Sequence, residues 1–85
     1  MSSVSIEWDR RALQELRALP QAARRRIYAA IGRLRDDPLR GAALSGRWRG
    51  LRKLRVGSYR VIYGFDGELL QVAVVRVGHR REAYR

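Results

Sequence analysis

Cysteine is absent from this 85-residue chain, and lysine and histidine occur only once each. Without cysteine, a disulfide framework and a thiolate metal site are both excluded, and the interior of a cell is the expected setting. The single histidine, His79, excludes a ribonuclease that uses two histidines as acid and base. No serine has the histidine and acid partners that a nucleophile needs. No glycine-rich loop has the spacing of a phosphate-binding loop.

Acidic residues are also scarce, with eight Asp and Glu in the whole chain. Asp36, Asp37, Asp66 and Glu68 fall in turns that are predicted to lie far apart, so neither a metal ion nor another cofactor is expected. No apolar run is long enough to span a membrane, and no basic-then-apolar leader opens the chain. The sequence therefore predicts a soluble, cytoplasmic protein.

Basic residues dominate what is present, since nineteen Lys and Arg give a formal net charge of +11. A positive field of this size concentrates phosphate-bearing ligands. Nucleic acid is the first expected partner, an acidic protein the second and a membrane surface the last, because no basic amphipathic helix carries an exposed aromatic face. Lys53 stands out among eighteen arginines (19 − 1). A lysine crowded by positive charge can lose its proton and act as a base, whereas arginine stays charged.

The segment 51–63, LRKLRVGSYRVIY, is predicted to form two strands joined by Gly57-Ser58, a two-residue connection typical of a type II′ turn. In this register Arg55 lies opposite Arg60, and directly opposed residues share one face of a sheet. One face is then apolar and carries Leu54, Val56, Tyr59, Val61 and Tyr63. The other face is basic and carries Lys53, Arg55 and Arg60. Like charges that lie opposite each other lower the stability of a strand pair by roughly 0.2–1 kcal/mol. This cluster is therefore either a solvated surface or a preformed binding site for a polyanion.

The N-terminal half is predicted to supply one strand and two helices. Residues 4–8 alternate between apolar and polar types, as in a short strand. The first helix begins after Asp9 as its N-cap and ends at Pro20. The second helix ends at Asp36-Asp37-Pro38. Its buried stripe is Ala23, Ile27, Ala30, Ile31 and Leu34. Residues 39–50 are expected to form a loop, anchored by Leu44 and Trp48.

A second tight turn is expected at Asp66-Gly67, which would pair Tyr63 with Leu70 and Val61 with Val72. Residues 69–77 are almost continuously apolar, as in a central strand. Residues 1–85 are therefore predicted to form one α+β domain of order β-α-α-β-β-β. A helical hairpin packs on one face of a mostly antiparallel four-stranded sheet. The opposite face stays open, and it is the basic one.

These motifs carry a resemblance. The segment LRKLRVGSYRVIY, the terminal VGHRREAY, and the helical hairpin with ALPQAARRRI that ends in DDP together resemble the RelE/ParE superfamily of bacterial and archaeal toxins over essentially the whole chain. The resemblance implies a RelE-like fold and a cognate antitoxin, whose acidic and aliphatic segment wraps the toxin. Members of the RelE branch are ribosome-dependent, metal-independent endoribonucleases that cut mRNA in the ribosomal A site. Members of the ParE branch poison DNA gyrase.

The resemblance also implies catalytic roles for four residues. Lys53 matches the general base for the 2′-hydroxyl of RNA, and Arg60 matches the arginine that stabilises the phosphorane charge. Arg80 matches the arginine that protonates or neutralises the leaving 5′-oxygen, and Tyr84 matches the aromatic residue that stacks on or orients the base. A second lysine of the best-studied type falls on Leu51 here, and the tail between Arg80 and Tyr84 is shorter than in that type.

Further basic residues complete the candidate site. Arg55 fits as a supporting phosphate contact, and Arg52, His79 and Arg81 are additional candidates for contacts with RNA phosphates. His79 is either an extra acid or a residue that completes a turn.

Three functions remain open at this point. An mRNA endoribonuclease is favoured, because ParE-type sequences usually lack the full Lys-Arg-Arg-Tyr set that is present here. A gyrase inhibitor without nuclease activity is the second, and a catalytically inactive basic module that binds nucleic acid is the third, for which charge alone would suffice.

Overall fold

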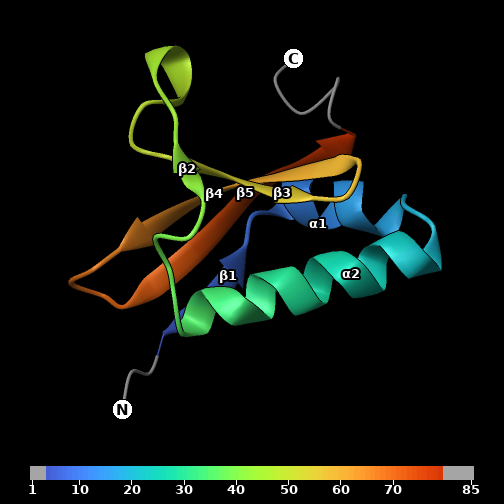
Figure 1. Ribbon diagram of the computed structural model, residues 1–85, viewed down its shortest axis with the longest axis horizontal. Coiled ribbons are helices and arrows are strands. Elements are labelled where there is room, and N and C mark those ends of the chain that lie inside the picture. The colour runs from blue at the N-terminus through green and yellow to red at the C-terminus, as the bar shows by residue number, and fades with distance from the viewer. Residues whose placement is uncertain (1–3, 80–85) are drawn as a thin grey trace.

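The two helices of the chain pack on one face of a five-stranded sheet in the computed structural model, which describes residues 4–79 (Figure 1). The elements in chain order are β1 (Ser5–Trp8), α1 (Arg10–Arg17), α2 (Gln21–Gly32), β2 (Ala42–Ala43), β3 (Arg52–Val56), β4 (Tyr59–Asp66) and β5 (Gln71–His79). The strand order is β1-β5-β4-β3-β2, with β1 parallel to β5 and the other pairs antiparallel. The predicted α+β class is confirmed. The fifth strand is β2, which lies in the predicted 39–50 loop and pairs with Arg52 and Lys53.

The helical hairpin begins where it was predicted to begin, but the α-helical part of α2 ends at Gly32, and a 3-10 turn at Arg33–Arg35 continues the chain toward the predicted end at Asp36-Asp37-Pro38. Asp9 occupies the N-cap position of α1 with extended backbone, although its side chain makes no capping hydrogen bond. Pro20 precedes α2. The guanidinium of Arg24 donates to the carbonyl of Leu19 at 2.7 Å and to that of Arg17 at 3.5 Å. The carbonyl of Arg17 belongs to the last turn of α1, where no helical N–H group is left to pair with it, and the carbonyl of Leu19 lies just beyond the helix. Arg24 therefore closes the corner between the two helices.

The core lies between the helices and the sheet. The predicted stripe of α2 is confirmed at Ala23, Ile27 and Ile31, and Leu34 extends it through a short 3-10 turn at Arg33–Arg35. The sheet contributes the alternate residues of its three central strands, Leu54, Val56, Val61, Tyr63, Val72, Val74 and Val77, all of which are buried. The apolar face predicted for the β3–β4 hairpin is therefore the core face.

The predicted register of this hairpin is confirmed in every pair, from Val56 opposite Tyr59 to Lys53 opposite Ile62. Gly57 takes φ = 60° at the turn, a conformation that suits glycine. A Cβ atom at Gly57 would also lie only 3.0 Å from both terminal nitrogens of Arg26. The turn therefore needs glycine for its backbone conformation, and the exposed side chain of Arg26 from α2 lies against it.

The predicted register of the second hairpin is wrong. Tyr63 pairs with Val74 rather than Leu70, and Val61 pairs with Val77 rather than Val72. The turn does begin at Asp66, but its carboxylate accepts the backbone N–H groups of residues 68 and 69 at 2.9 and 3.0 Å. These bonds stabilise a four-residue loop, residues 67–70, in place of the expected two-residue turn. Leu69 and Leu70, which were predicted to lie in or beside the strand, are exposed in this loop.

A β-bulge in β5 is the second source of the shift. Ile62 pairs with Arg76 while Tyr63 pairs with Val74, so Val75 is the extra residue. Regular alternation would have put Arg76 on the core face with Val74. The bulge reverses the alternation after Val74, so Val77 enters the core and Arg76 lies on the opposite face.

Candidate nucleic-acid interface

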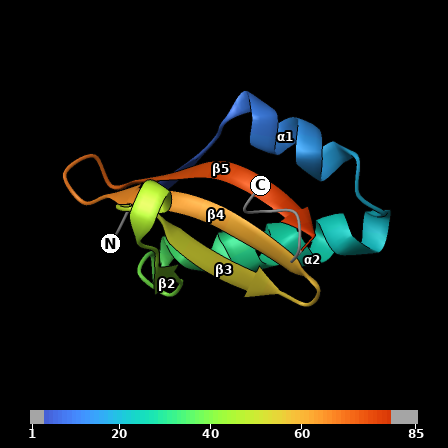
Figure 2. The ribbon, with the colours of Figure 1, turned by 90° about the horizontal axis from the view of Figure 1, so that it is seen from above.

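One face of the sheet faces away from both helices, and we call it the open face. Seen from above, β3, β4 and β5 lie between the viewer and α2 (Figure 2). Two rows of paired residues cross it: Lys53, Ile62 and Arg76 form one, and Arg55, Arg60 and Gly78 form the other. Ile62 is fully buried, whereas Lys53 and Arg60 are half-buried and Arg55 is exposed.

The structure therefore brings three of the predicted residues, Lys53, Arg55 and Arg60, onto one surface. The aliphatic stems of such residues can cover an apolar floor while their charged ends stay in water. A side chain held in this way is partly ordered before any ligand arrives, which is the condition for effective charge stabilisation.

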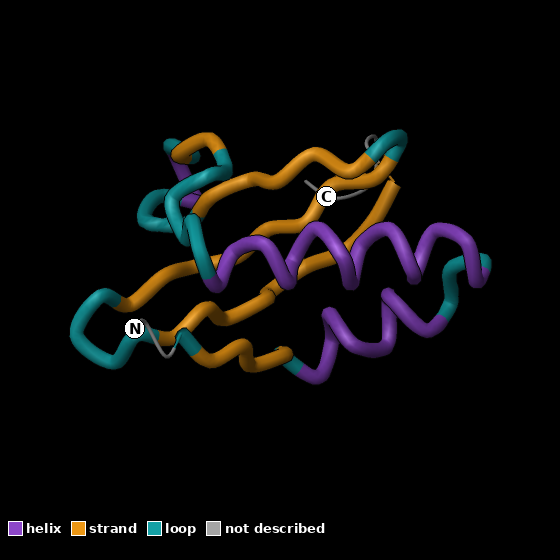
Figure 3. The backbone as a smooth tube through the Cα atoms, turned by 60° about the horizontal axis from the view of Figure 1, so that its bottom comes forward, coloured by secondary structure: helices purple, strands orange, loops and turns teal. Residues whose placement is uncertain are grey.

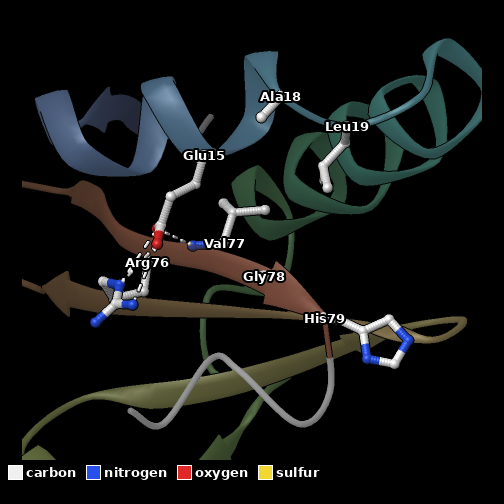
Figure 4. A pocket seen from close by; sticks show the side chains of 7 residues that line it. All are labelled: Glu15, Ala18, Leu19, Arg76, Val77, Gly78 and His79. Carbon is white, nitrogen blue, oxygen red and sulfur yellow. Dashed lines mark hydrogen bonds and ion pairs between the residues drawn. The ribbon is translucent and has the colours of Figure 1, made fainter.

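Arg76 is a charged residue that sequence reasoning did not assign to this face. It is 8% exposed and forms an ion pair with Glu15 of α1, with Nη2 to Oε2 at 3.1 Å (Figure 4). Its Nε also donates to both carboxylate oxygens of Glu15, at 3.2 and 3.1 Å. The only feature of the sequence that points to this ion pair is Glu15, the one acidic residue in the arginine-rich helix α1. Because Glu15 neutralises Arg76, the net positive charge of the open face comes from Lys53, Arg55 and Arg60.

Glu15 also satisfies an exposed strand edge. The pairing of β1 with β5 ends at Trp8 opposite Val74, so the edge of β5 beyond Val74 has no neighbouring strand among the described residues. The carboxylate of Glu15 accepts the backbone N–H of Val77 at 2.9 Å (Figure 4). An acidic side chain thus replaces the strand that is missing at this point.

Two of the predicted phosphate contacts lie elsewhere. Arg52 alternates with Lys53 along β3, and its guanidinium donates to the carbonyls of Gly41 at 2.6 Å and Leu39 at 3.2 Å. His79 pairs with Tyr59 on the core side of the sheet, and the two rings meet edge to face at 5.9 Å. Strand alternation therefore places both residues away from the open face, so the structure gives no support to their predicted contacts with RNA. Arg80, Arg81 and Tyr84 lie outside the described residues.

Tyr63 fixes the chain that leads into β2. Its hydroxyl donates to the carbonyl of Pro38 at 2.8 Å and accepts the N–H of Gly41 at 2.9 Å. Burial raises the pKa of Tyr63, and nearby Asp37 adds to this rise, while the Gly41 hydrogen bond and Arg52 oppose it. A Cβ atom at Gly41 would lie 2.7 Å from the carbonyl oxygen of Lys53 and 2.9 Å from the Tyr63 hydroxyl. Glycine at position 41 is thus required for this segment to lie against β3.

The segment 44–51 rises from the sheet on the side away from the helices (Figure 1). The N–H of Leu44 donates to the carbonyl of Leu51 at 3.0 Å, which closes the base of the loop. The side chain of Leu51 packs over Gly64, where a Cβ atom would lie 3.0 Å from it. Near the tip, the guanidinium of Arg47 lies 5.5 Å from the ring centre of Trp48, which is half-buried. This loop therefore borders the open face and adds a cation and an aromatic ring beside it.

No helix in residues 4–79 is long and apolar enough to cross a membrane. Within the same range, no three His, Asp or Glu side chains gather closely enough to bind a metal ion.

Comparisons with known proteins point to one family. Residues 6–84 match the family described as the ParE toxin of type II toxin-antitoxin system, parDE. The toxin RelG of Mycobacterium tuberculosis is 34% identical over 87 residues, which cover 95% of each chain. A chain in the toxin–antitoxin complex RelBE2 of Mycobacterium tuberculosis is 32% identical, with a TM-score of 0.73 over 91% of this chain and 98% of that chain. The isolated E. coli RelE toxin is 26% identical, with a TM-score of 0.79 over 96% of this chain and 92% of that chain.

Proposed function

This chain belongs to the RelE/ParE superfamily and is the toxin of a type II toxin–antitoxin system, and from this premise we propose that it is a ribosome-dependent mRNA endoribonuclease that inhibits translation. The observation that supports the proposal most directly is the open face. It carries Lys53, Arg55 and Arg60 on adjacent strands, over a buried Ile62.

The proposed reaction uses the nucleophile that RNA itself supplies. Lys53 accepts the proton of a 2′-hydroxyl, and the 2′-oxygen attacks the adjacent phosphorus. The bond from phosphorus to the 5′-oxygen of the next nucleotide breaks, which leaves a cyclic phosphate on one fragment. The 5′-oxygen must gain a proton as it leaves. Arg80 is the residue proposed to donate that proton or to neutralise the negative charge on the leaving oxygen. Arg60, supported by Arg55, neutralises the negative charge that builds up on the phosphorane.

Tyr84 is proposed to stack on or orient a base next to the cut. The arginines stay ionised and neutralise negative charge without exchanging a proton, whereas Lys53 can lose and regain a proton. No metal ion is required in this scheme, since positioning and fixed positive charge replace it.

A cognate antitoxin, the mRNA and the A site of the ribosome are the proposed partners, and the cytoplasm is the proposed location. RelE-type relatives occur in solved complexes with antitoxins, among them the RelBE2 complex of Mycobacterium tuberculosis and the E. coli RelBE complex. The net charge of +11 fits an antitoxin segment that is rich in acidic residues.

Inhibition of DNA gyrase is the second candidate function. It is favoured by one observation, the match of residues 6–84 to a family described by its ParE toxin. In that case the open face would bind a protein, and Lys53 would act only through its charge.

Two assays in parallel separate these functions. Purified toxin is incubated with ribosomes programmed with mRNA, and cleavage is followed by primer extension. The same preparation is tested for inhibition of DNA supercoiling by gyrase. The proposal requires cleavage that is lost in Lys53→Ala, and it is wrong if supercoiling is blocked while mRNA stays intact. An RNA that is bound but never cut would point to the inactive module.

A further inference from the structure

The loop over residues 44–51, between β2 and β3, carries Trp48 with an arginine on each side, Arg47 and Arg49. We call it the 44–51 loop. It stands at the end of β3 opposite the Gly57-Ser58 turn, on the side of the sheet away from α1 and α2 (Figure 1 and Figure 3). No acidic residue occurs from position 38 to position 65, so this part of the chain is uniformly basic.

The backbone of the 44–51 loop is held by its own hydrogen bonds. The N–H of Arg49 donates to the carbonyl of Gly46 at 3.1 Å. The N–H of Leu51 donates to the carbonyl of Trp48 at 3.0 Å. Gly46 and Gly50 take φ = 66° and 91°, conformations that residues with a Cβ atom rarely adopt. A loop that is ordered before binding loses little conformational entropy when a ligand arrives, so Trp48 is presented as a pre-positioned ring.

The two arginines beside Trp48 are available to a polyanion. Both are exposed, and within residues 4–79 neither has an ion pair or a side-chain hydrogen bond. The guanidinium of Arg47 lies 5.5 Å from the ring centre of Trp48. An exposed cation–π contact is weaker than the stacking of a nucleic-acid base on an aromatic ring. A base can therefore take the place of the guanidinium on the ring, and Arg47 can then bind a phosphate beside that base.

The 44–51 loop continues the surface proposed to hold RNA. Leu51, at the end of the loop, packs over Gly64, which lies two positions from Ile62 along β4 and therefore on the same open face. Leu51 also precedes Lys53 by two residues, which is about 7 Å of extended chain. A single strand bound across Lys53 and Arg60 thus has the loop directly beside it.

We propose that Trp48 is a base-stacking residue for single-stranded RNA. A base near the cleaved bond stacks on the indole ring, and Arg47 and Arg49 bind the phosphates on either side of that nucleotide. The inference rests on the proposed function in one respect, since it takes the RNA to be the mRNA held at Lys53. Aromatic rings flanked by cations suit single strands of any sequence, because every base has a π-face and the phosphates repeat along the backbone.

RNA fits the loop better than a protein partner does. Protein interfaces bury their aromatic anchors in a core that is depleted of charge, and the polar groups lie at the rim. Trp48 instead has arginines as its two neighbours in sequence, with glycines at positions 46 and 50. The ring is therefore surrounded in the loop by charge and backbone, and not by apolar side chains.

The test measures binding of two 2′-O-methyl oligonucleotides of equal length to the full chain by fluorescence anisotropy, without ribosomes. One carries adenine at every position, and the other has the same backbone without bases. The 2′-O-methyl groups block the nucleophile, so neither can be cut. Trp48→Leu should weaken binding of the adenine oligonucleotide about 5- to 150-fold, which corresponds to the roughly 1–3 kcal/mol of one stacked base. Binding of the base-free backbone should not change, and Trp48→Phe should restore most of the loss.

A matched pair of arginine variants tests the phosphate contacts. Arg49→Gln should weaken binding of both oligonucleotides alike and reduce the slope of log affinity against log salt by about 0.7, the value for one phosphate of a single strand. Arg25→Gln makes the same change in net charge at an exposed position of α2 and should leave that slope as it is in the parent.

Several outcomes would overturn the inference. Equal weakening of both oligonucleotides by Trp48→Leu would show that the residue only supports the loop. No weakening of either, or no binding of the adenine oligonucleotide by the parent, would show that Trp48 does not contact RNA. Unchanged RNA binding together with lost inhibition of gyrase would assign the loop to a protein partner. Because nothing is cut in this assay, base-dependent binding through Trp48 alongside intact mRNA on ribosomes would refute the nuclease proposal alone.

Discussion

Replacing Glu15 by alanine should destabilise the protein more than any other single loss of a carboxylate in residues 4–79. Two groups lose an interaction with Glu15 at once. The guanidinium of Arg76, which is 8% exposed, loses its carboxylate, and the backbone N–H of Val77 loses its acceptor at the edge of β5. Neither group can turn freely into water, because Val77 is 1% exposed and Arg76 lies against the sheet.

The magnitude follows from the burial of the pair. Breaking a buried ion pair costs about 3–5 kcal/mol, and an orphaned backbone N–H costs about 1–3 kcal/mol. Glu15 keeps 26% of its side-chain surface in water, so the ion-pair contribution belongs well below that range. We expect Glu15→Ala to lower the free energy of unfolding by about 2–3 kcal/mol in total, a large part of the roughly 5–15 kcal/mol that a domain has. Glu15→Gln keeps an acceptor for Val77 and should lose about half as much.

Urea unfolding followed by circular dichroism measures these differences, and a double-mutant cycle isolates the pair. Arg76→Met removes the charge that Glu15 balances, so the double variant should be more stable than the sum of the single losses predicts, by roughly 0.5–3 kcal/mol. Glu7→Ala, an exposed carboxylate in β1, is the control and should change stability by less than about 0.5 kcal/mol. If Glu15→Ala unfolds at the same urea concentration as the parent, or if the two losses simply add, the role assigned to Glu15 is incorrect.

Three further predictions concern the sheet and the open face. Tyr63→Phe should lower stability by about 1–3 kcal/mol, because Gly41 N–H loses its acceptor. Burial raises the pKa of Tyr63, so above about pH 10 the unfolded chain releases the tyrosine proton while the folded chain still holds it. The parent should therefore lose stability as the pH rises above about 10, and the phenylalanine variant should lose less. Urea midpoints measured from pH 8 to 11 test this. Val61→Asp should unfold the domain while Arg60→Ala leaves it folded, and equal falls in melting temperature would contradict the face assignment. Lys53→Arg should keep most RNA affinity but cut about 10²–10⁴-fold more slowly in single-turnover assays on ribosomes, and a near-parental rate would show that Lys53 is not the base.

The part of the fold that could be predicted depends on short-range signals. The β3–β4 hairpin was predicted in every pair, because Gly57-Ser58 fixes both the turn and the register within a few residues. The second hairpin was not, because its loop length depends on two hydrogen bonds to the Asp66 carboxylate and its register on a bulge at Val75. Neither feature changes the pattern of apolar residues, on which a prediction of strand register from the sequence depends.

The same distinction applies to the candidate site. Lys53, Arg55 and Arg60 were predicted together because one local hairpin carries all three. Arg52 was grouped with them as a sequence neighbour, although alternation along a strand sends adjacent residues to opposite faces. The pair of Glu15 and Arg76 joins residues 61 positions apart. A single sequence contains no signal for a contact of that separation.

The bulge at Val75 also determines where the chain can change in length. Shortening β5 by this one residue would leave Val74 opposite Tyr63 and Arg76 opposite Ile62, in unbroken alternation. Every other side chain would keep its present face, and the strand would lose mainly its local bend. Removal of Ala73 would instead move Val72 from the core to the opposite face. A deletion within the Val74-Val75 pair is therefore tolerable in a way that deletion of Ala73 is not, which makes this pair the natural place for β5 to vary in length.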